Sequence, residues 1–557
     1  MSQVILQKLH IRNLGPIKED SLTFEAFTYL VGRNNAGKSH YLQAVELLLA
    51  PKNPSSDEIS ILQNDKKQEI TIDGTFSGVG AFTNLVTKSN HKEAIQSAIV
   101  NDSLRVMRKL DSSDSDNCVF GVLDDNGEIQ NPAGFASNLL KILPEVISIV
   151  ATADTVDELK SKGNTAIVKL KKEVLANFLE NLNVKAQAAF ANIDEFLHSV
   201  EAAKRSPELT TFENDLKEEL VGEFVDVTPS VEFELPNVDV IAQQMRIYLD
   251  DGYRSEVEQK GHGLQRATLL ALLRLLAKQG KRFQDKPAPI FLIGEIETFL
   301  HPYAQRQLAL ALSNLVDRYQ IITTTHSPFI INPKNIAGYR RVVKGQSGTK
   351  VILPNWNDIQ IKEVKKHLEW RANLEGLFAE RIILIEGTHD ESFYELLRSL
   401  FGIEFPPKKF TLFVKAQGKK NLRLVRSFYI RMGFDDVAII SDLDYLFCND
   451  IRYLLEELKI DPAPIVGFRK HIEWTKEGDP GLGEILSKIE TNGEPAELND
   501  ALAMLSEKRV FVLKHGEPES YVKNGKGKKG SCNLVKTLDD LLEPDYLKDL
   551  IKSVVSP

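Results

Sequence analysis

The sequence predicts an α/β protein made of two α/β domains in succession. At roughly 100 to 200 residues per domain, its 557 residues are enough for two to four domains. Compact apolar or β-branched runs at residues 27–31, 287–293 and 320–324 are flanked by helical patterns, as the strands of a buried parallel sheet are. The pattern starts again at residues 381–385 and 437–440, where each short run ends in acidic residues. We therefore expect a second sheet in the C-terminal third.

The composition is that of an ordinary globular protein, with 42% hydrophobic, 26% charged and 8% aromatic residues. The net charge is −9, so any contact with nucleic acid must come from a local basic surface. Three scattered cysteines (Cys118, Cys448 and Cys532) are too few for a disulfide framework or a cysteine zinc site, which is typical of a reducing compartment. No apolar run approaches the roughly 18 residues of a membrane span. We expect a cytoplasmic protein without membrane contact.

The first domain, which we place at residues 1–350, begins with short strands between residues 4 and 31. Turns are expected at residues 13–16 and 18–20. A glycine-rich loop follows the last of these strands, and residues 41–49 then carry apolar side chains at helical spacing. The predicted order is therefore strand, loop and helix.

A helical insertion is expected at about residues 80–245, where no motif with chemistry occurs. Apolar residues recur every three or four positions between residues 167 and 182, as in an amphipathic helix. Such apolar faces fit either a core or a contact between subunits. Residues 351–371 have few helix or strand signals and mark the linker to the second domain, residues 372–557.

The segment from Gly32 to Ser39 matches the phosphate-binding pattern G-x-x-x-x-G-K-[ST]. In such a loop, backbone N–H groups and the helix N-terminus hold the phosphates of a nucleotide. The Lys38 ammonium would bridge the β and γ oxygens, and the Ser39 hydroxyl would ligate Mg²⁺. We therefore predict that Gly32, Asn35, Gly37, Lys38 and Ser39 bind ATP.

Three later segments have the form of the remaining parts of an ABC-type nucleotide site. Residues 260–266 precede an apolar helix and look like a signature loop, in which Gly263 would cap the γ-phosphate held by another subunit. Glu295 follows the next strand and is predicted to orient the attacking water. His326 follows the strand after that and would sense the γ-phosphate. Taken singly, Glu295 also fits a surface carboxylate and His326 a buried imidazole, but their order and placement favour the nucleotide site.

Acidic side chains follow two strands of the second domain. Glu386 and Asp390 are four residues apart, so they share a face if a helix begins near Glu386. Asp442 and Asp444 follow the next strand, where alternation would send both to one side. Four carboxylates at two strand ends suit divalent cations, Mg²⁺ first. Two metals about 4 Å apart can activate a water and stabilise the leaving oxygen in phosphodiester cleavage. Each pair alone is also typical of helix capping.

Two further features lie near the C-terminus. Glu519 follows the predicted strand at residues 510–513 and is a further candidate metal ligand. The basic segment at residues 523–529 fits either a contact with phosphates, including a lysine for the transition state, or a solvated loop.

With these residues in view, the chain resembles the OLD (overcoming lysogenisation defect) family. In this family an ABC-type ATPase domain precedes a Toprim nuclease domain, as in Gabija-type and retron-associated phage-defence systems. The resemblance covers nearly the whole chain except the insertion, and it is most specific in the phosphate loop combined with E-G-x-x-D and D-x-D downstream. It implies that the insertion is a dimerisation region and that residues 418–420 form the glycine turn of the family. It assigns catalytic and metal-binding roles to Glu386, Asp390, Asp442, Asp444 and Glu519.

The resemblance implies a Mg²⁺-dependent DNA endonuclease, with Mn²⁺ as a substitute metal, that ATP regulates in bacterial antiviral defence. It further implies a homodimer or larger assembly and, as a further partner, a companion defence protein or a retron nucleic acid. Two positions depart from the family pattern: Gly294 stands where an acidic residue is usual, and His262 where the signature loop usually has Ser. We therefore expect ATP to be bound but hydrolysed slowly.

Two other functions remain open from the sequence. One is an ATP-gated DNA-repair or chromosome-maintenance ATPase of the RecF and SMC kind, which would bind DNA without cutting it. The other is a topoisomerase or primase. A topoisomerase needs a nucleophilic tyrosine, and Tyr445 is the candidate beside the carboxylates.

Overall fold

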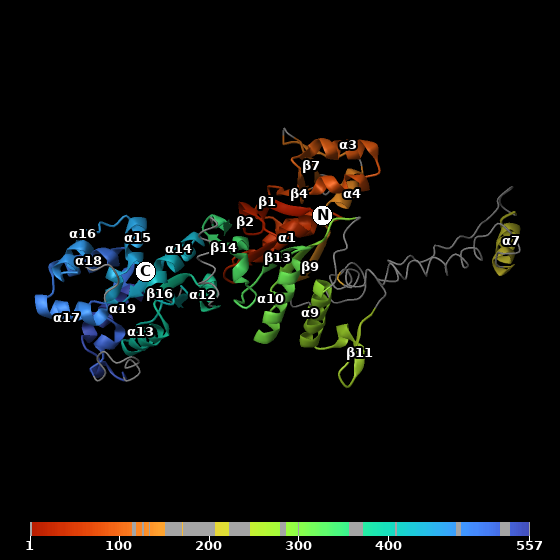
Figure 1. Cartoon of the computed structure of the whole chain (residues 1–557). Helices are drawn as coiled ribbons and strands as arrows, with labels where there is room; N and C mark the ends of the chain where they lie inside the picture. Colours follow the sequence, from red (N-terminus) through yellow and green to blue (C-terminus); the bar gives the residue numbers. More distant parts are fainter. Residues whose placement is uncertain are drawn as a thin grey trace. The chain divides into compact units, whose positions relative to one another are not determined.

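The computed structural model of the chain divides into two compact units, which are described separately (Figure 1). The first contains Met1–Glu145, Asp285–Glu297 and Tyr319–Pro557, and the second contains Val146–Gln284 and Thr298–Arg318. The structure describes residues 3–113, 118–124, 127–132, 134–150, 170, 207–221, 246–278, 286–298, 300–355, 371–406, 409–474, 481–523 and 535–555.

An antiparallel sheet opens the first unit, with its strands in the order β2-β1-β4-β6-β7-β8 and β5 paired to β6. Alternate residues of β6 are buried, which is the pattern of a strand with one face on the core. The helical insertion expected from residue 80 is therefore wrong for the segments that form β5, β6, β7 and β8, and the turn expected at residues 18–20 lies inside β2. The strands are β1 (Ile5–Leu14), β2 (Ile17–Thr23), β4 (Ile70–Ser77), β5 (Ile99–Val100), β6 (Ser103–Leu110), β7 (Val119–Leu123) and β8 (Ile129–Gln130). The helices among them are α2 (Ser56–Leu62), η1 (Val79–Leu85), α3 (Ser89–Ala98) and α4 (Phe135–Ile142).

A second sheet carries the phosphate loop, and its strands in this unit run in the order β15-β14-β3-β13-β12. The neighbours β12, β13, β3 and β14 are parallel, whereas β15 pairs antiparallel with β14. Every residue of β3, β12 and β13 is buried, which confirms the predicted parallel α/β sheet. The elements are β3 (Phe27–Val31), α1 (Lys38–Leu48), β12 (Ile290–Gly294), β13 (Gln320–Thr324), η4 (Pro333–Gly338), β14 (Tyr339–Gly345) and β15 (Gly348–Ile352). The predicted linker starts too early, because residues 351–352 complete β15.

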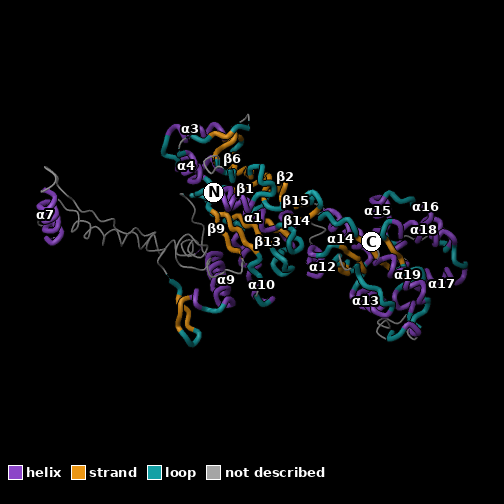
Figure 2. The backbone as a smooth tube through the Cα atoms, turned by 180° about the vertical axis from the view of Figure 1, so that it is seen from behind, coloured by secondary structure: helices purple, strands orange, loops and turns teal. Residues whose placement is uncertain are grey.

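The second unit contains two helices that lie side by side, α9 (His262–Lys278) and α10 (Pro302–Leu315) (Figures 1 and 2). The Arg318 guanidinium donates to the carbonyls of Leu276 and Ala277, which ties the chain after α10 to the end of α9. The other elements are β9 (Val146–Val150), α7 (Pro207–Val221), β10 (Tyr248–Asp250), β11 (Arg254–Glu256) and η3 (Val257–Gln259). Apart from Leu170, the helical pattern at residues 167–182 lies outside the described residues.

The C-terminal part of the first unit is built on four parallel strands in the order β17-β16-β18-β19. The predicted second sheet is thus confirmed, and helices drawn in purple in Figure 2 accompany it. The strands are β16 (Arg381–Ile385), β17 (Thr411–Lys415), β18 (Val437–Ser441) and β19 (Val510–Val512). The α-helices are α12 (Arg371–Glu375), α13 (Thr388–Leu400), α14 (Leu422–Arg431), α15 (Asn449–Leu458), α16 (Ala463–His471), α17 (Leu482–Asn492), α18 (Ala496–Glu507) and α19 (Pro544–Val555). Short 3₁₀ segments are η5 (Gly376–Phe378), η6 (Lys419–Asn421), η7 (Leu443–Phe447), η8 (Pro518–Tyr521) and η10 (Leu538–Asp540).

Within the described ranges, we find no helix that combines the length and the apolar character needed to cross a membrane.

Candidate functional site

The phosphate loop connects β3 to α1 in the predicted order of strand, loop and helix. Three of its residues, Gly32, Asn35 and Gly37, have positive φ angles of 146°, 61° and 99°. A side chain at Gly32 would place its Cβ 2.4 Å from the carbonyl oxygen of Val342 on β14, so the glycine is required for packing as well as for the turn. Gly37 caps α1, and Ser39 is exposed in its first turn.

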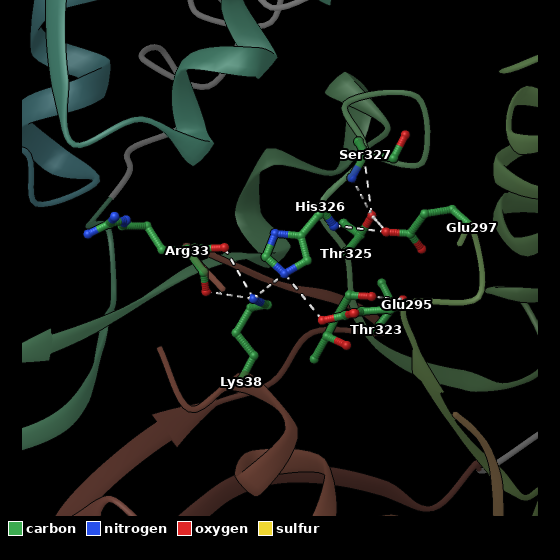
Figure 3. A network of polar contacts seen from close by, with 10 residues as sticks. Arg33, Lys38, Glu295, Glu297, Thr323, Thr325, His326 and Ser327 are labelled. Carbon is green, nitrogen blue, oxygen red and sulfur yellow. Dashed lines mark hydrogen bonds and ion pairs between the residues drawn. The ribbon is translucent and has the colours of Figure 1, made fainter. Parts of the chain in front are cut away.

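The side chain of Lys38 is buried, and its amine faces the interior of the loop (Figure 3). Its Nζ donates to the carbonyls of Gly32 and Arg33 at 3.2 and 2.9 Å and lies 2.6 Å from Nε2 of His326. The same His326 nitrogen lies 3.2 Å from the Glu295 carboxylate. Burial lowers the pKa of Lys38 to about 8, against the opposite effect of the Glu295 and Glu297 carboxylates. The structure therefore brings Lys38, Glu295 and His326 together.

A second carboxylate, Glu297, holds the segment after β13 in place. Its Oε1 accepts hydrogen bonds from the Thr325 hydroxyl at 2.6 Å and from the backbone N–H of His326 at 2.8 Å (Figure 3). Glu297 is buried, whereas the Glu295 side chain is 39% exposed and has a positive φ of 48°. The hydrogen bond with His326 lowers the pKa of Glu295 below its ordinary value. Sequence reasoning missed Glu297, although its place two residues after Glu295 was a usable signal.

The predicted signature loop belongs to the second unit. Gly263 lies in the first turn of α9, where the N–H groups of Leu264 and Gln265 donate to the Gly261 carbonyl. Its contact with a γ-phosphate in another subunit stays a prediction.

The phosphate loop also contacts the C-terminal part of the first unit. Arg33 forms an ion pair of 2.5 Å with Glu380, the residue before β16. The Glu380 carboxylate also accepts from the backbone N–H of Phe410, just before β17, at 2.8 Å. Before β18, the Gly433 carbonyl accepts from Arg341 of β14 at 2.7 Å. A cavity of about 710 Å³ lies beside these contacts and is lined by residues 32–36, 341–345, 379–380 and 433–436, among others.

Three predicted carboxylates converge at the carboxyl ends of β16 and β18. Ligand oxygens of Glu386, Asp442 and Asp444 lie within 4.8 Å of one another. The neighbouring strands β16 and β18 are parallel, which brings the residues that follow them to one edge of the sheet. Strand alternation was the wrong reason for the position of Asp444, because this residue lies in η7.

The two other predicted ligands lie outside this group. Asp390 is the third residue of α13, which begins at Thr388 rather than near Glu386, so the expected shared helix face is wrong. Its Oδ2 accepts from the Gly387 N–H at 2.8 Å, which is a helix-capping contact. Glu519 lies in η8 and is buried. Burial raises the pKa of Asp390, and the charge of Glu519 raises it further. Beyond Lys523, the basic segment lies outside the described residues.

The three grouped carboxylates fit a divalent cation. Burial raises the pKa of Glu386, and burial together with the charges of Glu386, Asp390 and Asp444 raises the pKa of Asp442 well above its ordinary value. The Oδ1 atom of Asp444 is buried and, within the described part of the chain, has no hydrogen-bond partner. Grouped carboxylate oxygens are the ligands that Mg²⁺ and Mn²⁺ prefer. A bound cation would therefore reduce the electrostatic repulsion among the three carboxylates.

Two neighbours of the cluster are Ser441, which was not assigned a role from the sequence, and Tyr445, the candidate nucleophile of a topoisomerase. The Ser441 hydroxyl donates to Glu386 Oε1 at 2.6 Å, and the Asp442 N–H lies 3.3 Å from the same oxygen. Tyr445 is fully buried, and its hydroxyl donates to Asp450 at 2.9 Å. Burial raises the pKa of Tyr445 well above its ordinary value, which argues against the nucleophile that a topoisomerase needs.

Comparison with known families finds matches to both halves of the chain. Residues 5–331 match the AAA ATPase domain family, and residues 377–444 match the family described as "Overcoming lysogenization defect protein-like, TOPRIM domain". The Old nuclease of Escherichia phage P2 is 26% identical over 463 residues, which cover 80% of this chain and 78% of that protein.

Solved SMC head domains are more distant matches. An SMC head bound to the C-winged helix domain of ScpA is 16% identical and covers 62% of this chain and 96% of that chain, with a TM-score of 0.37. The SMC head domain from Thermotoga maritima is 12% identical and covers 63% of this chain and 99% of that chain, with a TM-score of 0.30.

Proposed function

The chain belongs to the OLD family, in which a nuclease combines an ATPase domain with a TOPRIM domain, and we propose that it is a Mg²⁺-dependent DNA endonuclease regulated by ATP binding. We propose that this activity serves bacterial antiviral defence and that the protein acts in the cytoplasm. The ATPase and TOPRIM matches together account for both domains of the chain.

The convergence of Glu386, Asp442 and Asp444 is the observation that carries the proposal. Two metal ions in such a site supply an activated water and stabilise the leaving oxygen of a phosphodiester. Glu386, Asp442 and Asp444 would hold the metal, with Asp390 and Glu519 as candidate ligands of a second ion. Ser441 orients Glu386 through its hydroxyl. These side chains lie at the end of a rigid parallel sheet, where a bound phosphate would meet preorganised groups.

ATP would bind through Lys38 and the backbone of the phosphate loop, with Ser39 as the Mg²⁺ ligand. Glu295 and His326 would contact the γ-phosphate side, since His326 lies 2.6 Å from the Lys38 amine and 3.2 Å from the Glu295 carboxylate. Gly294 supplies no carboxylate to help hold Mg²⁺, so we expect slow hydrolysis. ATP would then act as a ligand that favours one arrangement of the protein.

A plasmid assay with the purified protein tests the nuclease function. Supercoiled, linear and branched DNA would be compared as substrates; at least one form should be cut in the presence of Mg²⁺ or Mn²⁺, and EDTA should stop the reaction. Binding of DNA without nicked or linear products would instead support a repair or chromosome-maintenance ATPase. Relaxed closed circles would support a topoisomerase.

The same assay tests the role of ATP. A non-hydrolysable ATP analogue should change the cleavage rate in the same direction and to the same extent as ATP. Brisk ATP turnover, or an analogue without effect where ATP has one, would show that hydrolysis drives the cycle.

Self-assembly is also proposed, because Gly263 needs a second subunit to cap a γ-phosphate in an ABC-type site. Light scattering with and without ATP should find at least a dimer.

Companion proteins or a retron nucleic acid remain candidate partners, and co-purification from cells that carry the neighbouring genes would identify them.

A further inference from the structure

Lys419 lies beside the carboxylate cluster. Its Nζ is 2.5 Å from Oδ2 of Asp444, and the side chains of Lys419 and Asp444 are 19% and 18% exposed. Two nearby cations are engaged elsewhere: Lys415 pairs with Glu391, and Arg423 pairs with Asp450 and Glu457. Lys419 thus brings a positive charge directly to a carboxylate that is predicted to hold metal.

The backbone before Lys419 is attached to the strand that carries Glu386. After β17, the N–H of Ala416 donates to the Ile385 carbonyl at 2.8 Å, and the N–H of Gly418 donates to the Glu386 carbonyl at 3.0 Å. Gln417 and Gly418 both have positive φ angles, 60° and 109°, so the chain turns sharply at this point. Lys419 follows as the first residue of η6. Its amine is therefore positioned by the same backbone that positions Glu386.

The two carboxylate oxygens of Asp444 have different surroundings. Oδ2 pairs with Lys419, whereas Oδ1 is buried and lacks a hydrogen-bond partner among the described residues. The ion pair therefore restricts the rotation of the carboxylate. It also offsets the mutual repulsion of three carboxylates whose oxygens lie within 4.8 Å.

We propose that Lys419 is a positioning residue of the metal site, acting through Asp444 as the internal counter-ion of the three carboxylates. This inference rests on the proposed nuclease function. An ammonium paired with Asp444 repels a divalent cation held by the same cluster, so it weakens metal binding while it keeps the carboxylate oriented. Loss of the charge should therefore have two opposite effects: tighter metal binding and slower cleavage.

Direct metal titration separates these effects. Mn²⁺ binding to the full-length protein without DNA would be measured by electron paramagnetic resonance for the wild type, Lys419→Met, Lys419→Gln and Lys419→Arg. We expect both neutral variants to bind Mn²⁺ about tenfold more tightly, as the Coulomb repulsion at contact range predicts, and Lys419→Arg to stay near the wild type. The control is Lys508→Met, which removes an exposed charge at the end of α18.

Cleavage at saturating Mn²⁺ supplies the second measurement. Lys419→Met should cut plasmid DNA about tenfold more slowly, Lys419→Arg should recover part of the rate, and Lys508→Met should match the wild type. Thermal melting would establish that each variant is folded. If Lys419→Met does not fold, Lys419→Gln replaces it as the neutral variant.

The outcomes distinguish this inference from the proposed function. Unchanged or weaker Mn²⁺ binding in the folded neutral variants would overturn the counter-ion role while leaving the nuclease intact. A wild-type protein that binds no Mn²⁺, or that binds it as well after Asp442→Asn, would overturn the metal site and the inference with it.

Discussion

At the scale of single residues, the candidate sites differ in how their charges are balanced. Lys38 is a buried amine surrounded by carbonyl oxygens, an imidazole and the charge of Glu295. Burial raises the pKa values of the Glu386 and Asp442 carboxylates, and the charge of Asp444 raises both further. Each arrangement leaves an opposite charge to be supplied by a ligand: phosphate in the first, and a divalent cation in the second.

Loss of one carboxylate of the cluster should stop cleavage without unfolding the protein. We expect Asp442→Asn and Asp444→Asn each to reduce plasmid cleavage about 100-fold or more, because each change removes a charged metal ligand and keeps the shape of the side chain. Asp500→Asn, on the exposed face of α18, is the matched control. Wild-type cleavage by either folded cluster variant would disprove the assignment.

Nucleotide affinity should depend on pH through Lys38. Burial lowers the pKa of Lys38 from 10.5 to about 8 in the free protein, whereas bound phosphates favour the charged amine. Above pH 8 the amine must therefore take up a proton on binding, so ATP affinity should fall by up to about tenfold per pH unit.

Calorimetry in buffers of different ionisation enthalpy would detect this proton uptake. Lys38→Met should bind ATP weakly and lose the dependence above pH 8. A wild-type affinity that stays constant from pH 7 to 10 would contradict the low pKa of Lys38.

At the scale of elements, the ends of parallel strands position the functional groups, and hydrogen bonds link one strand end to the next. Glu297, after β12, accepts from Thr325 and His326 after β13. Ser441, at the end of β18, donates to Glu386 after β16. Gly418, after β17, donates to the Glu386 carbonyl. Such links keep loop residues in register with the rigid sheet beneath them.

Glu297→Ala should destabilise the protein, whereas Glu295→Ala should not. Removal of Glu297 takes the carboxylate acceptor from the His326 N–H and from the buried Thr325 hydroxyl, which keeps only a contact of 3.4 Å with the Ser327 carbonyl, at a cost of about 2 kcal/mol in the free energy of unfolding. Glu295 is partly exposed, and its loss should cost less than about 1 kcal/mol. Thermal melting without nucleotide would compare the two variants, and equal melting temperatures would contradict the linking role of Glu297.

At the scale of the whole molecule, contacts in the first unit connect the phosphate loop to the strands that carry the carboxylates. Glu380 pairs with Arg33 just before β16 and also accepts from the N–H of Phe410 before β17. Arg341 holds the Gly433 carbonyl shortly before β18. Lys38 donates to the Arg33 carbonyl, so a nucleotide that attracts the Lys38 amine would act on the residue that contacts Glu380.

The Arg33 and Glu380 pair should transmit part of the effect of ATP on cleavage. Arg33→Glu or Glu380→Arg alone should reduce that effect several-fold, because each places like charges in contact, and the double charge swap should restore it. ATP affinity would be measured alongside. Arg12→Glu, which disturbs the exposed Arg12 and Glu19 pair at 2.9 Å, is the control. An ATP effect that survives both single changes would exclude this contact from the regulation.

The local motifs could be predicted from the sequence alone, because their chemistry lies in contiguous residues. A strand, a glycine-rich loop and a helix at residues 27–49 are sufficient to place Lys38 at a helix N-terminus. The apolar runs that become β16 and β18 are equally local signals, and acidic residues directly after them could be identified as candidates.

Only the tertiary structure decided which of these candidates meet. Glu386 and Asp444 are 58 residues apart and come together because β18 pairs with β16, a strand order that depends on packing across the whole sheet. Asp390 matched the motif as well as Glu386 did, but the actual start of α13 makes it a capping residue. The segments that form β5, β6, β7 and β8 were expected to belong to a helical insertion and are strands instead, because pairing with β4 buries one face of β6. Long-range hydrogen bonding and burial, which no short window of sequence contains, set these outcomes.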